Sequence, residues 1–164
     1  MGAWDTGSFD NDDALDHLAI FIEAPEGTGK EKAPGKLALI TGPLTTLVDG
    51  REKNPRGVIK APDASVAIAA AELLAAALGR PHPAIADADQ SDDDDDFALA
   101  RQWAAGRGRQ EPTLARPQLR ELAIKAVTLV RDSSELADLW ADAQPEHATA
   151  WKGAIEDLLE RLRA

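Results

Sequence analysis

The chain has 164 residues, no cysteine and a formal net charge of −11. This length suits a single domain, and the absence of cysteine excludes disulfides, thiol catalysis and cysteine-ligated zinc. A surface this acidic repels nucleic acid, so we expect no nucleic-acid partner.

The composition favours an all-α fold. Alanine and leucine, which are strong helix formers, are abundant, whereas the β-branched and aromatic residues that favour strands are scarce. The longest apolar stretch, residues 66–79, is shorter than the roughly 20 residues that a membrane span needs. No secretory signal pattern is visible near residue 1. We therefore expect a cytoplasmic protein with no membrane partner.

The first predicted helix spans residues 10–23. Asp10 is its expected N-cap, and Asp12 and Asp13 lie in the first turn, where the helix dipole favours negative charge. Phe9, just before the cap, can pack back over that turn.

The next part of the chain is ambiguous. Residues 24–36 are predicted as a flexible, basic loop. Two short apolar runs, residues 37–40 and 58–59, fit either very short strands or irregular segments that cover the core, and residues 43–48 between them fit a short helix.

The clearest core helix spans residues 62–79 and is apolar nearly all round, so it should lie at the centre of the molecule. Residues 82–96 and 106–116 are predicted as flexible loops, the first with an acidic run at Asp92–Asp96. We predict one domain, residues 1–164, with five to seven helices and at most two very short strands within residues 37–60. The remaining helices are predicted at residues 95–105, 117–130, 132–141 and 145–163.

The N-terminal block, GAWDTGSFDNDDALD, carries the most specific pattern. Trp4 and Phe9 are large and should be buried, and Gly7 should permit a turn. Asp10 and Asn11 then lead into the first helix. We therefore interpret the block first as a structural element that anchors the N-terminal segment and starts the first helix.

This block resembles the opening of a bacterial family catalogued as domain of unknown function 4259. Similar segments follow at Leu78–Pro81, Ser134–Trp140 and Trp151–Leu162. The fourth motif position, usually glycine, is Asp5, which tolerates a positive φ less well. The resemblance implies no activity, substrate or catalytic residue. The matching motif positions are Gly2, Ala3, Trp4, Gly7, Phe9, Asn11, Asp12 and Ala14.

Asp12, Asp13, Asp16 and His17 form the best candidate metal site. Asp12 and Asp16, like Asp13 and His17, are four residues apart and share a helix face, and carboxylate with imidazole suits a divalent cation. The alternative interpretation is helix capping with one exposed histidine, and we favour it.

Other catalytic patterns are weak. The Asp92–Asp96 run lacks the spacing of a calcium loop, and Gly27–Lys30 lacks the first glycine and the Ser/Thr of a phosphate loop. No nucleophile elbow is present. We expect no cofactor.

The leading functional hypothesis is an acidic, non-enzymatic interaction module that binds a basic protein, as an immunity protein or antitoxin does. Residues 26–60 form a basic region with seven Lys/Arg against four Asp/Glu. The alternatives are a metal-dependent enzyme that uses Asp12 and Asp16, and a structural homo-oligomer.

Overall fold

The computed structural model describes residues 5–30, 32–89 and 94–164. Within these ranges it contains eight α-helices, one turn of π-helix and one two-stranded sheet, which confirms the all-α fold class. The number of helices exceeds the expected five to seven. The elements are α1 (Asp12–Glu23), β1 (Gly29–Lys30), β2 (Ala33–Pro34), α2 (Lys36–Lys53), α3 (Ala61–Ala77), α4 (Pro83–Ala86), α5 (Asp96–Trp103), η1 (Ala104–Gly108), α6 (Pro117–Ser133), α7 (Glu135–Ala141) and α8 (Pro145–Arg163).

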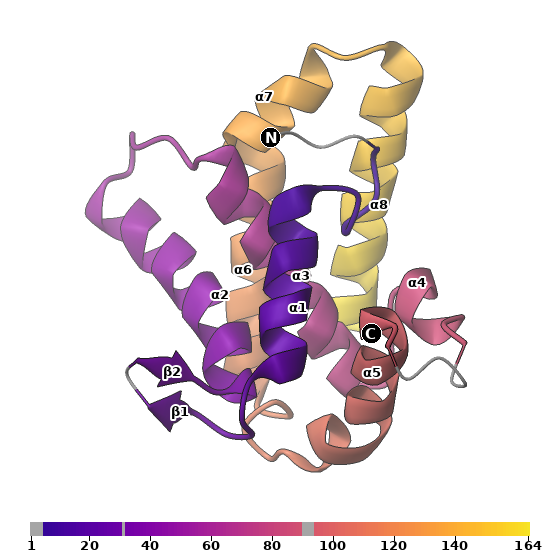
Figure 1. Cartoon of the computed structure of the whole chain (residues 1–164). Helices are drawn as coiled ribbons and strands as arrows, with labels where there is room; N and C mark the ends of the chain where they lie inside the picture. Colours follow the sequence, from indigo (N-terminus) through magenta and orange to yellow (C-terminus); the bar gives the residue numbers. More distant parts are fainter. Residues whose placement is uncertain (1–4, 31, 90–93) are drawn as a thin grey trace.

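Helix α3 occupies the centre of the molecule, as its all-round apolar sequence predicts. It contacts α1, α2, α5, α6, α7 and α8, and Figure 1 shows α1 in front of it, with α2 to one side and α8 to the other. Thirteen of its 17 residues are buried, most of them alanine. These small side chains allow several helices to approach α3 closely. No described helix combines the length and apolar character needed to cross a membrane.

Helix α2 corrects the prediction for residues 37–53. In place of a short strand or irregular segment followed by a short helix, one helix of 18 residues runs from Lys36 to Lys53. Residues 58–59 lie beyond this helix, where Ile59 is buried and makes a single parallel bridge to Ser134.

Helix α2 has Pro43 in its interior. Proline has no N–H, so it cannot donate to the carbonyl four residues earlier, that of Leu39. In its place, the buried ring of His17 on α1 donates from Nε2 to the Leu39 oxygen at 2.9 Å. Packing against α1 therefore stabilises a helix that its own sequence interrupts.

The single sheet of the described residues lies in the segment predicted as a loop. Strands β1 and β2 pair antiparallel, with Gly29 opposite Pro34 and Lys30 opposite Ala33. Gly29 has a φ of 70°, and a Cβ there would run into the backbone of Pro34 and Gly35. The hairpin therefore requires glycine at this position. The other two segments predicted as loops contain α4 and the end of η1.

Candidate functional site

The segment before α1 forms a closed turn. The Asp10 carboxylate accepts a hydrogen bond from the Gly7 N–H at 2.8 Å, and the Asp10 N–H donates to the Gly7 carbonyl at 3.1 Å. A Cβ at Gly7 would collide with that carboxylate, so the turn needs glycine. Because Asp10 is engaged here, the N-cap is Asn11, whose Oδ1 accepts from the Ala14 N–H at 2.8 Å. The prediction of Asp10 as the cap was wrong by one residue.

Phe9 anchors this segment. Its ring is 4% exposed and meets the rings of Phe97 and His82 edge-on, with centroids 5.3 and 5.5 Å apart. These contacts tie the N-terminal turn to Phe97 of α5 and to His82, the residue that precedes α4. Phe9 therefore packs against more of the molecule than the first turn of α1. No described non-glycine residue has a positive φ, so Asp5 replaces the usual glycine without backbone strain. Trp4 lies outside the described residues.

A polar network in the core holds the turn to α3 and α8. Glu72, in the middle of α3, is completely buried, and its carboxylate receives a two-pronged ion pair from Arg161 of α8, at 2.7 and 3.0 Å. The Ser8 hydroxyl donates to the same carboxylate at 2.6 Å. The buried charge is thus paired and hydrogen-bonded, as a buried carboxylate must be.

The guanidinium of Arg161 is satisfied on its other sides as well. Its Nε donates to Asp157 at 2.8 Å, and one terminal nitrogen donates to the Arg80 carbonyl at 3.2 Å. Burial lowers the pKa of Arg161, but the hydrogen bonds and charges of Glu72 and Asp157 outweigh this and leave the pKa above its ordinary value. Sequence analysis missed this network, although Glu72 is the one charged residue in an otherwise apolar stretch.

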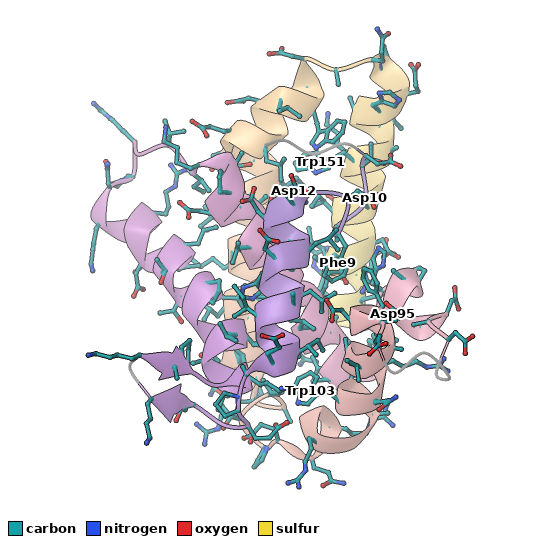
Figure 2. The ribbon with its side chains drawn as sticks, viewed as in Figure 1. Phe9, Asp10, Asp12, Asp95, Trp103 and Trp151 are labelled. Carbon is teal, nitrogen blue, oxygen red and sulfur yellow. The ribbon has the colours of Figure 1, made fainter. Side chains whose placement is uncertain are left out.

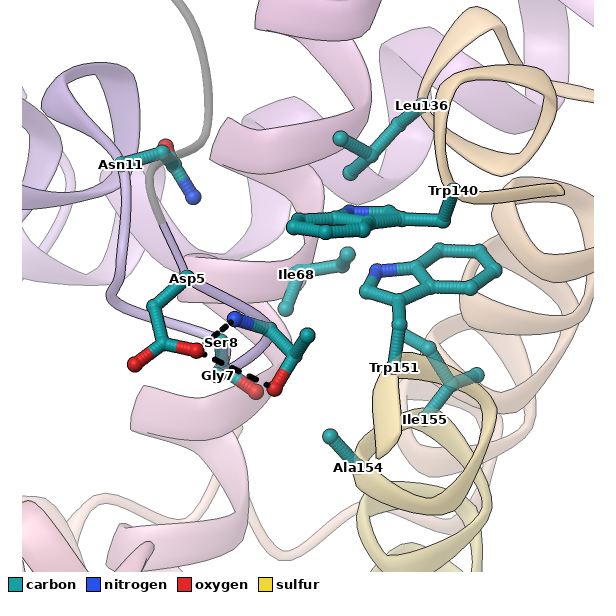
Figure 3. Close-up of a pocket in the computed structure, with 11 residues that line it drawn as sticks. Asp5, Gly7, Ser8, Asn11, Ile68, Leu136, Trp140, Trp151, Ala154 and Ile155 are labelled. Carbon is teal, nitrogen blue, oxygen red and sulfur yellow. Dashed lines mark hydrogen bonds between the residues drawn. The ribbon is translucent and has the colours of Figure 1, made fainter. Parts of the chain in front are cut away.

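The cavity beside this turn is too small for a substrate. Figure 3 shows its walls, with the rings of Trp140 and Trp151 facing Ile68 and the N-terminal turn. The enclosed space is about 10 Å³, roughly what one water molecule needs. Trp140 and Trp151 are 7% and 4% exposed and belong to the core. Trp103, at the end of α5 (labelled in Figure 2), is also buried. Its ring meets that of Phe21 of α1 edge-on, with centroids 4.7 Å apart.

The structure does not bring the predicted metal ligands together. Asp16 is exposed, Asp12 and Asp13 are half-buried, and His17 is buried against α2. The described residues contain no group of three or more His, Cys, Asp or Glu side chains that could hold a metal ion. Burial lowers the pKa of His17, and its bond to the Leu39 carbonyl only partly offsets this. The His17 imidazole is thus engaged in a hydrogen bond to α2, and the metal hypothesis gains no geometric support.

The outward side of α1 carries carboxylates that no cation of the described residues neutralises. Asp13, Asp16 and Glu23 share this side with Ile20, which is 56% exposed. Among the described residues, none of the three carboxylates lies in an ion pair. Asp96, in the first turn of the neighbouring α5, extends the negative charge. We call these five residues the acidic face.

Like charges meet on the acidic face. The pKa of Asp96 is raised, first by desolvation and then by the charges of Asp95 and Glu23. Figure 2 places Asp95 at the start of α5, beside α1. Repulsion of this kind is unfavourable for the isolated protein.

The basic segment after α1 is partly structural. Lys36 is only 8% exposed, and its ammonium donates to the carbonyls of Ile22 and Ala24 at 2.9 and 2.5 Å. It therefore satisfies the open end of α1. Desolvation lowers the pKa of Lys36, and the charge of Glu26 partly offsets it.

Comparison with known proteins identifies the family and nothing more specific. A family model described as "Domain of unknown function (DUF4259)" matches residues 2–154. This confirms the resemblance that the N-terminal block indicated. No curated protein and no solved structure matches the chain.

Proposed function

Since the chain belongs to the family described as domain of unknown function 4259, whose description names no activity, we propose a function from its surface: it is a non-enzymatic interaction module. Its acidic face binds and neutralises a basic protein, in the manner of an immunity protein or antitoxin, in the cytoplasm.

Glu23 is the observation that carries this proposal. It is the last residue of α1, where the helix dipole disfavours a negative charge. Lys36 bonds to the nearby carbonyls, yet no described cation lies within ion-pairing distance of the Glu23 carboxylate. The pKa of Asp96 is raised by desolvation and by the charge of Asp95, and the Glu23 carboxylate adds to this shift. Glu23 thus works against the stability of the fold, which is expected of a residue that serves a partner.

Ile20 supplies the second ingredient of an interface. A half-exposed isoleucine among carboxylates gives an apolar contact within a charged rim, the usual arrangement of binding surfaces. Negative potential over the rim would speed the approach of a basic partner and select against acidic ones. Binding of this kind weakens as salt rises.

The test is affinity capture from the organism that encodes the chain, followed by mass spectrometry. Three forms are compared as bait: wild type, Asp16→Lys/Glu23→Lys, and the control Asp142→Lys/Glu146→Lys, which reverses two exposed carboxylates at the α7–α8 turn. A basic protein should be retained by wild type and by the control and be lost from the first variant.

Thermal unfolding shows that each bait is folded. Retention of the same protein by all three baits, or capture of no basic protein at all, would refute the proposal.

A further inference from the structure

A groove of about 520 Å³ lies between the C-terminal half of α2, residues 54–59 and the start of α3. Its apolar walls include Leu47, Val58 and Val66, and Val58 is 63% exposed. A volume of this size falls within the range of small-molecule sites. The groove shares no residue with the acidic face.

The absence of a side chain at Gly50 leaves the groove open. A Cβ built on Gly50 meets no atom within 4 Å, so the space beside this turn of α2 is empty. Helix interiors disfavour glycine by roughly 0.5–1 kcal/mol relative to alanine.

The outer wall of the groove is fixed in place. Arg51 donates from one terminal nitrogen to the Pro55 carbonyl at 2.6 Å and from the other to the hydroxyl and carbonyl of Ser133 at 3.0 and 3.2 Å. Further along, the Glu135 N–H donates to the Ile59 carbonyl at 2.9 Å. Because these contacts reach α6 and α7, the groove is formed before any ligand arrives.

One end of the groove is cationic. Arg51 lines it, and its Nε is buried with no hydrogen-bond partner among the described residues. Lys53 and Arg56 follow it in sequence and are exposed, and neither has an ion-pair partner in the described part of the chain. Glu52, the carboxylate between Arg51 and Lys53, is neutralised by Lys125 at 2.5 Å.

The positive charge at this end of the groove is opposite in sign to that of the whole chain, which has a net charge of −11. Asp63 lines the other side of the groove, at the first turn of α3. Because the Asp63 carboxylate would repel a negative headgroup, such a headgroup fits better at the Arg51 end.

We propose that the groove binds a small amphipathic carboxylate. The apolar body lies along Leu47, Val58 and Val66, and the carboxylate lies at the Arg51 end, where its charge is complementary to that of the guanidinium. This site is additional to the proposed protein interface and does not depend on it.

Octanoate is the probe, and octylammonium, with the same apolar body and the opposite charge, is its control. Binding is measured by calorimetry and located by amide chemical shifts. We expect octanoate to bind the wild type and shift resonances of the groove, and octylammonium not to bind there.

Two leucine substitutions on α2 form a matched pair. Gly50→Leu fills the groove, whereas Gly42→Leu adds the same side chain at a position that also has open space but does not line the groove. Octanoate affinity should fall at least about tenfold in Gly50→Leu, a change of about 1.4 kcal/mol, and stay unchanged in Gly42→Leu.

Val58→Asp provides a second disruption at an exposed position, in case Gly50→Leu does not fold. The proposal is overturned if wild type does not bind octanoate, if octylammonium binds equally well, or if the folded groove variants retain full affinity.

Discussion

His17 and Pro43 form a pair at the residue scale. Pro43 leaves the Leu39 carbonyl without its helical donor, and His17 replaces that donor from another helix. The sequence contains both residues, but nothing in it indicates that they meet, because the contact depends on how α1 and α2 pack.

A double-mutant cycle tests this pairing by urea unfolding. His17→Leu leaves the part-buried Leu39 carbonyl without this donor and should cost about 1–3 kcal/mol. In a Pro43→Ala background, the new N–H can bond to Leu39, so the same His17→Leu change should cost clearly less. Equal costs in the two backgrounds would show that His17 does not act through this carbonyl.

His17 also predicts how stability depends on pH. The pKa of His17 in the folded protein lies below its ordinary value of 6.5, so the unfolded chain binds the extra proton more readily. Its contribution is complete above the unfolded pKa and is lost as pH falls from about 6.5 toward the folded pKa. Between pH 8 and pH 5, the free energy of chemical unfolding should fall by more in wild type than in His17→Gln. An equal fall in both proteins would show that other groups cause the pH dependence.

Glu72 and Arg161 make a buried pair whose members are 89 residues apart in sequence. Glu72→Leu alone removes the two-pronged partner of a guanidinium that is only 16% exposed and leaves it paired with Asp157 only, so this change should cost about 3 kcal/mol. Glu72→Leu/Arg161→Leu removes both charges, and we expect it to be more stable than Glu72→Leu. Denaturant midpoints decide the question, and a double variant that loses the sum of the two single costs contradicts a buried pair.

At the scale of elements, the sequence predicts best those helices that have one strong apolar stripe. α1, α6 and α8 follow such stripes and were predicted to within a few residues. α2 was missed because Gly42, Pro43 and Gly50 interrupt it, although its buried residues Ile40, Leu44, Leu47 and Val48 fall at helical spacing. α4 is one turn long and too short to leave a period.

The candidate site was less predictable than the fold. The positions of Asp13 and Asp16 on one side of α1 follow from helical spacing. The repulsion between Glu23 and Asp96 does not, because it arises only where α1 and α5 pack. Helical spacing also suggested that His17 was a ligand, whereas tertiary packing turns its ring toward α2.

Two helical glycines should respond in opposite ways to alanine. Gly153 in α8 is exposed with open space around it, so Gly153→Ala should stabilise the protein by about 0.5–1 kcal/mol. At Gly108, in the last position of η1, a Cβ would come within 2.9 Å of the Trp103 ring, so Gly108→Ala should lower stability. Calorimetric melting temperatures compare the two, and a change of the same sign in both would contradict the packing around Trp103.

At the scale of the whole molecule, the charges divide by role. Lys36 is buried and Arg161 is mostly buried, and both stabilise the fold, Arg161 by pairing with Glu72 and Lys36 by closing the end of α1. The carboxylates of the acidic face make no ion pair in the described residues, and at Glu23 they oppose the fold. We attribute their presence to a partner.

The most direct test is the affinity of the captured basic protein, measured by calorimetry as salt is raised. We predict tight binding to wild type that weakens steadily with salt, and a large loss of affinity in Asp16→Lys/Glu23→Lys at low salt. An affinity that is unchanged by both salt and charge reversal would contradict the acidic face as the binding surface.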